Sequence, residues 1–389
     1  DEDVNYRFSG GLTADIQLLP FLNWNSQLGY EVTNTSSTFF EDPRTKHDQY
    51  FSQLGSLSET SSKRNSFSWR SMLSVNKFWE NHSLTGFASV EYQYEDYDYT
   101  NIRGEFEESL LIENLASIDK GEPEKDMSKS NFMGIVFQAE YGYKGKYYVS
   151  GSVRTDGSSR FYKDNRWGTF WSVGGNWRIS KEAFMEDVSW INNLSLKVSY
   201  GQQGNDDILK ISGGVYTSDY YLWQSLYDLG WANSNQIGGL VSTLENKDVS
   251  WEKSGNFNVG IEASFLDNRL SINAEYYNKK TTDMLLNYPM ATSTGFSGYN
   301  ANVGDMRNSG FEFEIKGTPV KTNNFTWNIT WMGSTVKNKV LKLTGETPEI
   351  IDGIYSIKEG LPINTFYMAK AAGVDPATGA QLYWVYDTD

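Results

Sequence analysis

Residues that could carry acid–base, nucleophilic or metal chemistry are scarce in this sequence. It has no cysteine and two histidines, His47 and His82, which lie far apart. Disulfides and thiolate metal sites are therefore excluded, and a histidine zinc site or a Ser-His-Asp triad has little to build on. Paired carboxylates that act as acid and base face each other across a cleft, about 5–9 Å apart. The adjacent Asp206 and Asp207 give no such arrangement, so the sequence argues against an enzyme.

Clustered carboxylates suggest a loop calcium site as one interpretation. The run comprises Glu91, Glu95, Asp96, Asp98, Glu105, Glu107 and Glu108. Calcium prefers carboxylate oxygens, but the regular Asp-x-Asp-x-Asp-Gly spacing of a calcium loop is missing. A solvated acidic surface is the favoured interpretation, and no cofactor is predicted.

An aromatic segment is the main candidate for substrate or partner contact. It comprises Tyr220, Tyr221, Trp223, Tyr227 and Trp231. Flat rings can stack on sugars or hold peptide side chains at the mouth of a pore. The alternative is that the rings pack between loops or against a partner protein.

The elements that must position these residues are β-strands. Ile135, Phe137 and Ala139 alternate with Gln138 and Glu140, and such a period of two places each set on one face of a strand. The same alternation recurs in hairpins along the chain and predicts an all-β fold of about fourteen strands, each roughly ten residues long, which is enough to cross a bilayer when tilted.

Connection lengths and hydropathy favour a membrane barrel. Mean hydropathy is -0.54, and no apolar run reaches the ~18 residues of a spanning helix. Short turns are expected around Pro20, Asn81, Lys144, Asn268 and Pro319. Long polar connections are expected at 39–64, 101–130, 204–250, 285–303 and 339–361. Short turns on one side and long loops on the other are typical of transmembrane antiparallel barrels of the bacterial outer membrane.

Alternation also assigns the two faces of the predicted sheet. The apolar set, expected to face lipid, includes Ile135, Phe137, Val259, Ile261, Ile272 and Trp327. The polar set, expected to face the lumen, includes Glu140, Glu262, Asn273 and Glu312. A soluble solenoid or sandwich would also alternate. A rival interpretation is therefore a secreted or surface β-rich protein that binds glycans or acts as an adhesin.

Six strings, in order, resemble the SusC/RagA family of TonB-dependent transporters. The first is Arg154-Thr-Asp-Gly-Ser-Ser-Arg-Phe161 together with Asn165–Gly168 and Trp177–Glu182. The others are Leu194–Asn205, Trp251–Lys253, Tyr276–Leu285, Asn302–Glu312 and Gly373–Gly379. The first string holds a dense charged group, Arg154, Asp156 and Arg160 with Asp164 and Arg166. This group could orient substrate or hold a plug in the lumen, and the resemblance favours a structural role.

The resemblance implies an integral outer-membrane protein of a Gram-negative bacterium of the Bacteroides group. Such barrels have about 22 strands and a plugged lumen. They import oligosaccharides or peptides with a SusD-like surface lipoprotein and with energy from the TonB complex. Residues 1–389 are expected to form the middle of the barrel domain, with the plug domain, the TonB box and the closing C-terminal strands outside this chain. The net charge of -15 argues against nucleic acid as a partner.

Overall fold

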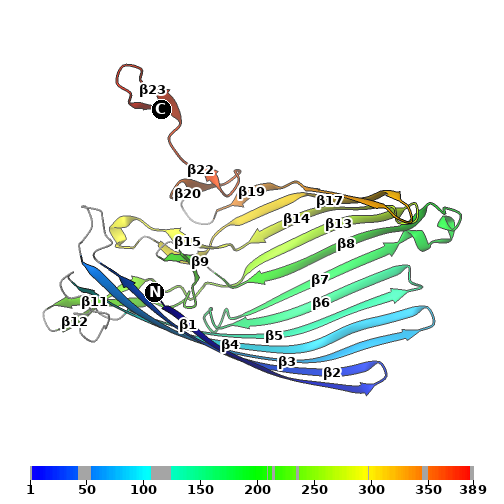
Figure 1. Ribbon diagram of the computed structural model, residues 1–389, viewed down its shortest axis with the longest axis horizontal. Coiled ribbons are helices and arrows are strands. Elements are labelled where there is room, and N and C mark those ends of the chain that lie inside the picture. Colours follow the sequence, from blue (N-terminus) through cyan, green and yellow to red (C-terminus); the bar gives the residue numbers. More distant parts are fainter. Residues whose placement is uncertain are drawn as a thin grey trace. The chain divides into compact units, whose positions relative to one another are not determined.

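A computed structural model describes residues 2–42, 54–106, 124–207, 209–212, 215–233, 236–296, 298–343 and 349–385. These residues form antiparallel strands and a few short 3-10 turns (Figure 1). None of the helical turns in these ranges is long and apolar enough to cross a membrane. The contacts divide the chain into two compact units, of which the first contains Asp1–Tyr143, Ser150–Phe170 and Leu209–Leu222, and the second contains Lys144–Val149, Trp171–Ile208 and Trp223–Asp389.

The first unit is built on a sheet of long sequential hairpins. Each strand pairs antiparallel with the next one along the chain: β1 (Glu2–Leu19), β2 (Leu22–Glu41), β3 (Gly55–Trp79), β4 (His82–Phe106) and β5 (Glu124–Tyr143). Two of the hairpins close in tight turns, where Leu19 pairs with Leu22 and Trp79 with His82. In the second of these turns Glu80 has a positive φ of +48°, as primed hairpin turns do.

The second unit contains a sheet with the strand order β8–β13–β14–β17–β18. Its strands are β8 (Ile191–Asn205), β13 (Glu252–Phe265), β14 (Leu270–Thr282), β17 (Asp305–Lys321) and β18 (Thr326–Ser334). The far end of β17 also pairs with β19 (Lys337–Lys342). Two further strands, β6 (Tyr147–Ser158) and β7 (Trp167–Arg178), are divided between the units, and β7 pairs with β8 through residues 172–178.

The strands are longer than alternation predicted. β3 and β4 each have 25 residues, so much of the connections predicted at 39–64 and 101–130 is strand. Backbone pairing continues there although the side chains no longer alternate, because ladder hydrogen bonds do not depend on a lipid-facing side. A small core holds these strand ends together: Leu57 and Phe106 are buried, and Phe40 stacks on Phe106 with ring centroids 5.5 Å apart.

The other predicted loops contain short hairpins. They are formed by β9 (Leu209–Ser212) with β10 (Val215–Ser218), β11 (Leu226–Asn233) with β12 (Gln236–Thr243), β15 (Leu285–Pro289) with β16 (Gly298–Asn302), and β20 (Glu349–Asp352) with β21 (Tyr355–Lys358). Beyond the predicted loops, β21 also pairs with β22 (Thr365–Phe366), and β23 (Ala371–Val374) pairs with β24 (Gln381–Tyr383). The regions expected as long polar connections therefore contain strands of their own. Few of their residues alternate, so period alone could not identify such short strands.

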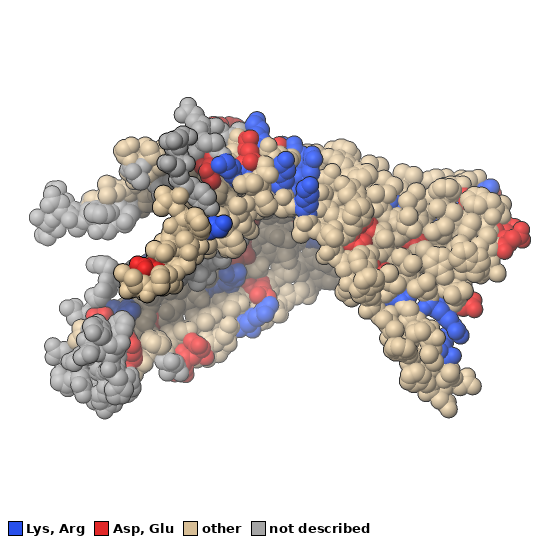
Figure 2. All heavy atoms as spheres, turned by 90° about the horizontal axis from the view of Figure 1, so that it is seen from above, with Lys and Arg blue, Asp and Glu red and all other residues tan. Residues whose placement is uncertain are grey.

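Strand register confirms that the apolar and charged sets lie on opposite faces. In the second unit, Ile261 pairs with Leu196 and Ala274, whereas Glu262 pairs with Ser195 and Asn273. Ile261 is 49% exposed although it is apolar. Other members of the predicted lipid-facing set that are exposed are Ile135, Phe137 and Trp327. In the view of Figure 2, charged residues occur in separate groups with broad uncharged areas between them.

Replacing one residue on each face tests which face meets hydrocarbon. Because we expect the apolar face to contact lipid, Ile261→Arg should lower the free energy of unfolding by about 2 kcal/mol. Glu262→Arg, one residue away on the charged face, should cost less than about 1 kcal/mol, the scale of an exposed ion pair. Urea unfolding in lipid vesicles measures both, and equal losses would contradict the assignment.

Candidate functional site

The charged group of β6 is organised around Arg154. Its Nε donates to both carboxylate oxygens of Asp156 at 2.6 Å, and its Nη2 donates to Glu91 Oε2 at 3.3 Å. Asp156 is only 6% exposed, so its charge depends on this partner. Glu91 pairs in register with Gly134, and a Cβ at Gly134 would lie 2.8 Å from both Arg154 Nη2 and Asp156 Oδ1. The glycine therefore makes the space that the ion pair occupies.

The same group fastens the end of β6 onto β5. The Arg154 guanidinium lies over the ring of Phe132, 5.7 Å from its centroid. Asn131 and Ser159 exchange two hydrogen bonds of 2.9 Å, one through the backbone N–H of Ser159 and one through its hydroxyl. Phe161 is fully buried just beyond. These contacts join the end of β6 to β4 through Glu91 and to β5 through Phe132 and Asn131, and the structural role that the resemblance favours stays a prediction.

Arg160 contacts the aromatic segment. Its guanidinium lies 4.8 Å from the ring centroid of Tyr220, within the range of a cation–π interaction. Tyr221 donates its hydroxyl to the backbone oxygen of Met127 at 3.2 Å and its N–H to Asp219 Oδ1 at 3.0 Å. Leu222 is fully buried next to them. Tyr220 and Tyr221 thus both make contacts within this chain.

The other rings of the segment belong to the second unit. Tyr227 is 61% exposed at the start of β11, and Trp223 is half-buried. Trp231 pairs with Gly238 in the β11–β12 hairpin, and its side chain lies outside the described residues. Among the four predicted contact residues whose side chains are described, Tyr227 is the most exposed and therefore the most accessible to a partner or to cargo.

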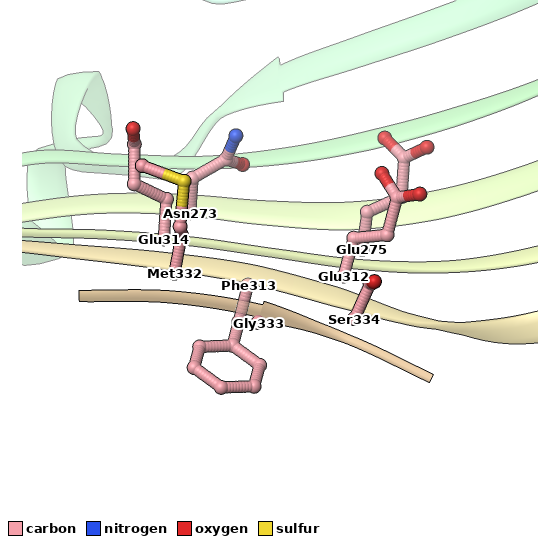
Figure 3. Close-up of a pocket in the computed structure, with 8 residues that line it drawn as sticks. All are labelled: Asn273, Glu275, Glu312, Phe313, Glu314, Met332, Gly333 and Ser334. Atoms are coloured by element: carbon pink, nitrogen blue, oxygen red, sulfur yellow. The ribbon is translucent and has the colours of Figure 1, made fainter. Parts of the chain in front are cut away.

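The charged face of the second unit carries a shallow acidic hollow of about 610 Å³ (Figure 3). Glu275 and Glu312 pair directly across β14 and β17, and Asn273 pairs with Glu314. These side chains point to one side of the sheet, whereas Phe313 points to the other. Lys316 pairs with Glu314 at 2.8 Å. Sequence analysis placed Asn273 and Glu312 on this face, but that Glu275 lies directly opposite Glu312 is known only once the strand register is known.

The other predicted lumen charges lie in the same kind of position. Glu262 forms an ion pair with Lys197 across β13 and β8. Glu140 pairs in register with Thr85, and Phe137, on the opposite face of β5, pairs with Ala88. Like Glu312, both are on faces opposite to the exposed apolar side chains. Whether those faces line a lumen stays a prediction.

The acidic run proposed for calcium is divided among ion pairs. Arg64 lies 3.0 Å from Glu95, Lys129 lies 3.7 Å from Asp96, and Arg103 lies 3.9 Å from Glu105. Nowhere in the described part of the chain do three or more His, Cys, Asp or Glu side chains form a group suited to a metal ion. Glu107 and Glu108 lie outside that part. Four acids of the run, Glu91, Glu95, Asp96 and Glu105, therefore have a cationic partner.

A second polar network, which sequence reasoning did not select, lies in the turn between β7 and β8. Glu182 separates the short turns Ile179–Lys181 and Ala183–Met185. Its Oε1 accepts from the Tyr147 hydroxyl at 2.5 Å and from Trp177 Nε1 at 3.0 Å, and its Oε2 accepts from Lys146 Nζ at 3.1 Å. These hydrogen bonds, that of Tyr147 foremost, lower the pKa of Glu182 to about 2. The string Trp177–Glu182 marked this segment in the sequence, but it did not identify Tyr147 and Lys146 as hydrogen-bond donors to Glu182.

Breaking the Arg154 pair should destabilise the protein. Asp156→Asn leaves the guanidinium with Glu91 alone and should lower the free energy of unfolding by about 1–2 kcal/mol. Glu91→Gln is the matched control and should cost less than half as much, because its contact is longer and its side chain more exposed. Urea titration in detergent micelles gives both values. Equal losses, or no loss for Asp156→Asn, would contradict the structural role.

Glu182 should make stability depend on acid pH. Its pKa is about 2 in the folded protein and higher in the unfolded chain. Its contribution is therefore complete above the unfolded pKa of about 4.3 and is lost as the pH falls toward 2. Glu182→Gln should be less stable than the parent protein at pH 7, and the difference should shrink between these two pH values. Unfolding curves at several pH values provide the measurement, and a constant difference would refute the assignment.

Comparison with known proteins places this geometry in a family. The family described as TonB dependent receptor-like, beta-barrel, matches residues 1–384. TonB-dependent receptor P39 of Formosa agariphila is 30% identical over 363 residues, which cover 92% of this chain and 34% of that protein. SusC of Bacteroides thetaiotaomicron is 24% identical over 393 residues, 99% of this chain and 36% of that protein. The chain thus spans about a third of the length of these relatives.

Solved structures agree with this result. The RagAB peptide importer in its closed-closed state matches with a TM-score of 0.85 and 29% identity over 98% of this chain and 42% of that one. The siderophore receptor PiuA from Acinetobacter baumannii shares the fold, with a TM-score of 0.53 and 11% identity. The rival interpretation, a secreted adhesive β-protein, does not agree with these matches. The chain belongs to the TonB-dependent receptor β-barrel family, is similar to its SusC and RagA members, and is part of an integral outer-membrane protein.

Proposed function

We propose that this chain forms part of the barrel of a SusC/RagA-type transporter that imports oligosaccharides or peptides across the outer membrane with energy from TonB. The observation that carries the proposal is the two-faced sheet of a TonB-dependent receptor. Apolar rows such as that of Ile261 are exposed on one side, and rows rich in carboxylates lie on the other. This pattern fits a wall between hydrocarbon and a hydrated lumen.

The charge of the inner face limits the class of cargo. Glu275, Glu312 and Glu314 gather on one patch of it, and the whole chain has a net charge of -15. Polyanions would be repelled over the screening distance of about 8 Å. Neutral oligosaccharides and peptides remain, and the similarity to SusC and to the RagAB peptide importer supports this range.

The same proposal includes partners and further parts of the protein. Residues 1–389 would be the middle of a barrel that encloses a plug domain, and the plug would receive energy from the TonB complex. A SusD-like surface lipoprotein would cover the mouth, so the functional unit would be a larger complex. Exposed rings such as Tyr227 would lie at this mouth and contact cargo or lipoprotein, because stiff aromatic surfaces bind at low entropic cost.

Growth and uptake by the complete transporter test the proposal. A strain that lacks the gene of the complete transporter should not grow on the oligosaccharide or peptide that the transporter imports. Returning the full gene should restore this growth only in cells that also have TonB. Tyr227→Ala combined with Trp231→Ala should lower uptake several-fold or release the lipoprotein during purification, while the barrel still assembles. Loss of two interface aromatics, at roughly 1 kcal/mol or more each, is enough for such a change.

The matched control is Tyr221→Phe, which removes the hydroxyl that bonds to Met127 but keeps the ring. It should leave uptake and lipoprotein binding unchanged. Growth of the deletion strain on every oligosaccharide and peptide source, or uptake that persists without TonB, would overturn the proposed function. Normal uptake by the double variant with normal lipoprotein binding would instead overturn only the role of the rings.

A further inference from the structure

An apolar groove of about 550 Å³ lies on the second unit, where β13, β14, β17 and β18 begin or end at their short connections. Its walls include Leu266 and Trp331, which are 56% and 62% exposed. The groove opens on the exposed apolar face of the sheet, opposite to the acidic hollow. A groove bordered by large exposed apolar side chains marks a surface that contacts a protein, a ligand or the membrane.

A missing side chain creates the groove. Leu270, Gly317 and Ile329 form one row across β14, β17 and β18. The next row on the same face of the sheet has Ile272, Ile315 and Trp331. Gly317 therefore leaves a gap among large side chains. A Cβ built at Gly317 would meet nothing within 4 Å. The register shift of β17 after Gly317 then turns the strand toward its hairpin.

A cation stands at the edge of this groove. Arg269 lines it from the β13–β14 turn, where its N–H donates to Leu266 O at 3.1 Å and its carbonyl accepts from Thr318 N–H at 2.7 Å. Within the described residues its guanidinium takes part in no ion pair. The backbone of Arg269 is thus fixed, while its charge is available to an outside group.

Aromatic side chains place this end of the unit at the membrane surface. Trp190 stacks on Phe265 with ring centroids 5.7 Å apart, and its carbonyl accepts from Leu266 N–H. Trp327 is exposed beside the β17–β18 hairpin. Such rings gather at headgroup depth in membrane proteins. If the apolar face meets lipid, as the proposed function requires, the groove extends from the headgroup layer into the hydrocarbon.

We propose that this groove is a binding site for one anionic phospholipid. An acyl chain lies over Gly317 between Leu270, Ile329 and Trp331, and the phosphate meets the guanidinium of Arg269. Charge complementarity and the apolar lining together select this occupant. A free phosphate would use one exposed arginine and none of the groove, and screening by salt would weaken that contact. A zwitterionic lipid would fill the groove with less electrostatic attraction.

Native mass spectrometry of the complete, delipidated transporter tests the charge. We expect phosphatidylglycerol to bind more tightly than phosphatidylcholine. Arg269→Gln should weaken phosphatidylglycerol binding about fivefold, equivalent to the ~1 kcal/mol of one arginine at an anionic surface, and should remove most of the difference between the lipids. Lys321→Gln is the matched control, because it removes a nearby charge that does not line the groove.

Gly317→Leu tests the groove itself. The added side chain enters open space, so the barrel should assemble and should bind both lipids several-fold more weakly. Equal binding of the two lipids by the parent protein, or unchanged binding by both variants, would refute the proposal. Displacement of phosphatidylglycerol by millimolar inorganic phosphate would show that the site takes a free anion. If Gly317→Leu does not assemble, phosphatidylglycerol binding by Arg269→Gln is compared with that by Lys321→Gln, and equal binding by these two variants refutes the proposal.

Discussion

Backbone hydrogen bonding between antiparallel strands is the constraint on which the rest of this structure depends. A chain that crosses hydrocarbon must pair every backbone N–H and C=O internally, and long hairpins do so strand by strand. Each ladder fixes a register, and register fixes which side chains share a face. The rows that contain Ile261 and Glu262 follow from pairing with β8 and β14. The acidic hollow and the groove at Gly317 follow from the pairing of β17 with β14 and β18.

Once register is fixed, a glycine within a row of larger side chains shows where space is left between them. Gly134 has no side chain at the position where the ion pair of Arg154 and Asp156 lies. Gly317 has none at a position on the apolar face where the neighbouring side chains are large. The first space is filled by the protein and the second is open. The first space is occupied by an ion pair, and the second is where we propose that a lipid binds. The same kind of residue therefore has two consequences, which depend on what lies opposite.

Ends of strands carry the polar networks. Glu182 collects three donors in the β7–β8 turn, and Asp375 accepts from Ala377 N–H and Thr378 Oγ1 in the loop between β23 and β24, which lowers its pKa. Both belong to strings by which the sequence resembles SusC/RagA transporters. Turns need specific side chains because the backbone groups there lose their ladder partners.

The sequence by itself determined the all-β class, the two faces and the family, because alternation with a period of two and the turn strings are local properties of the chain. It assigned Ile261 and Glu262 to opposite faces, as register confirms. It did not determine the 25-residue extent of β3 and β4 or the hairpins within the predicted loops, where polar residues lie on both faces. Only the tertiary structure decided which distant residues meet: Glu91 with Arg154, Glu275 with Glu312, and Leu270 with Gly317 and Ile329. The physical reason is that pairing between strands distant in sequence depends on register, which no short stretch of sequence contains.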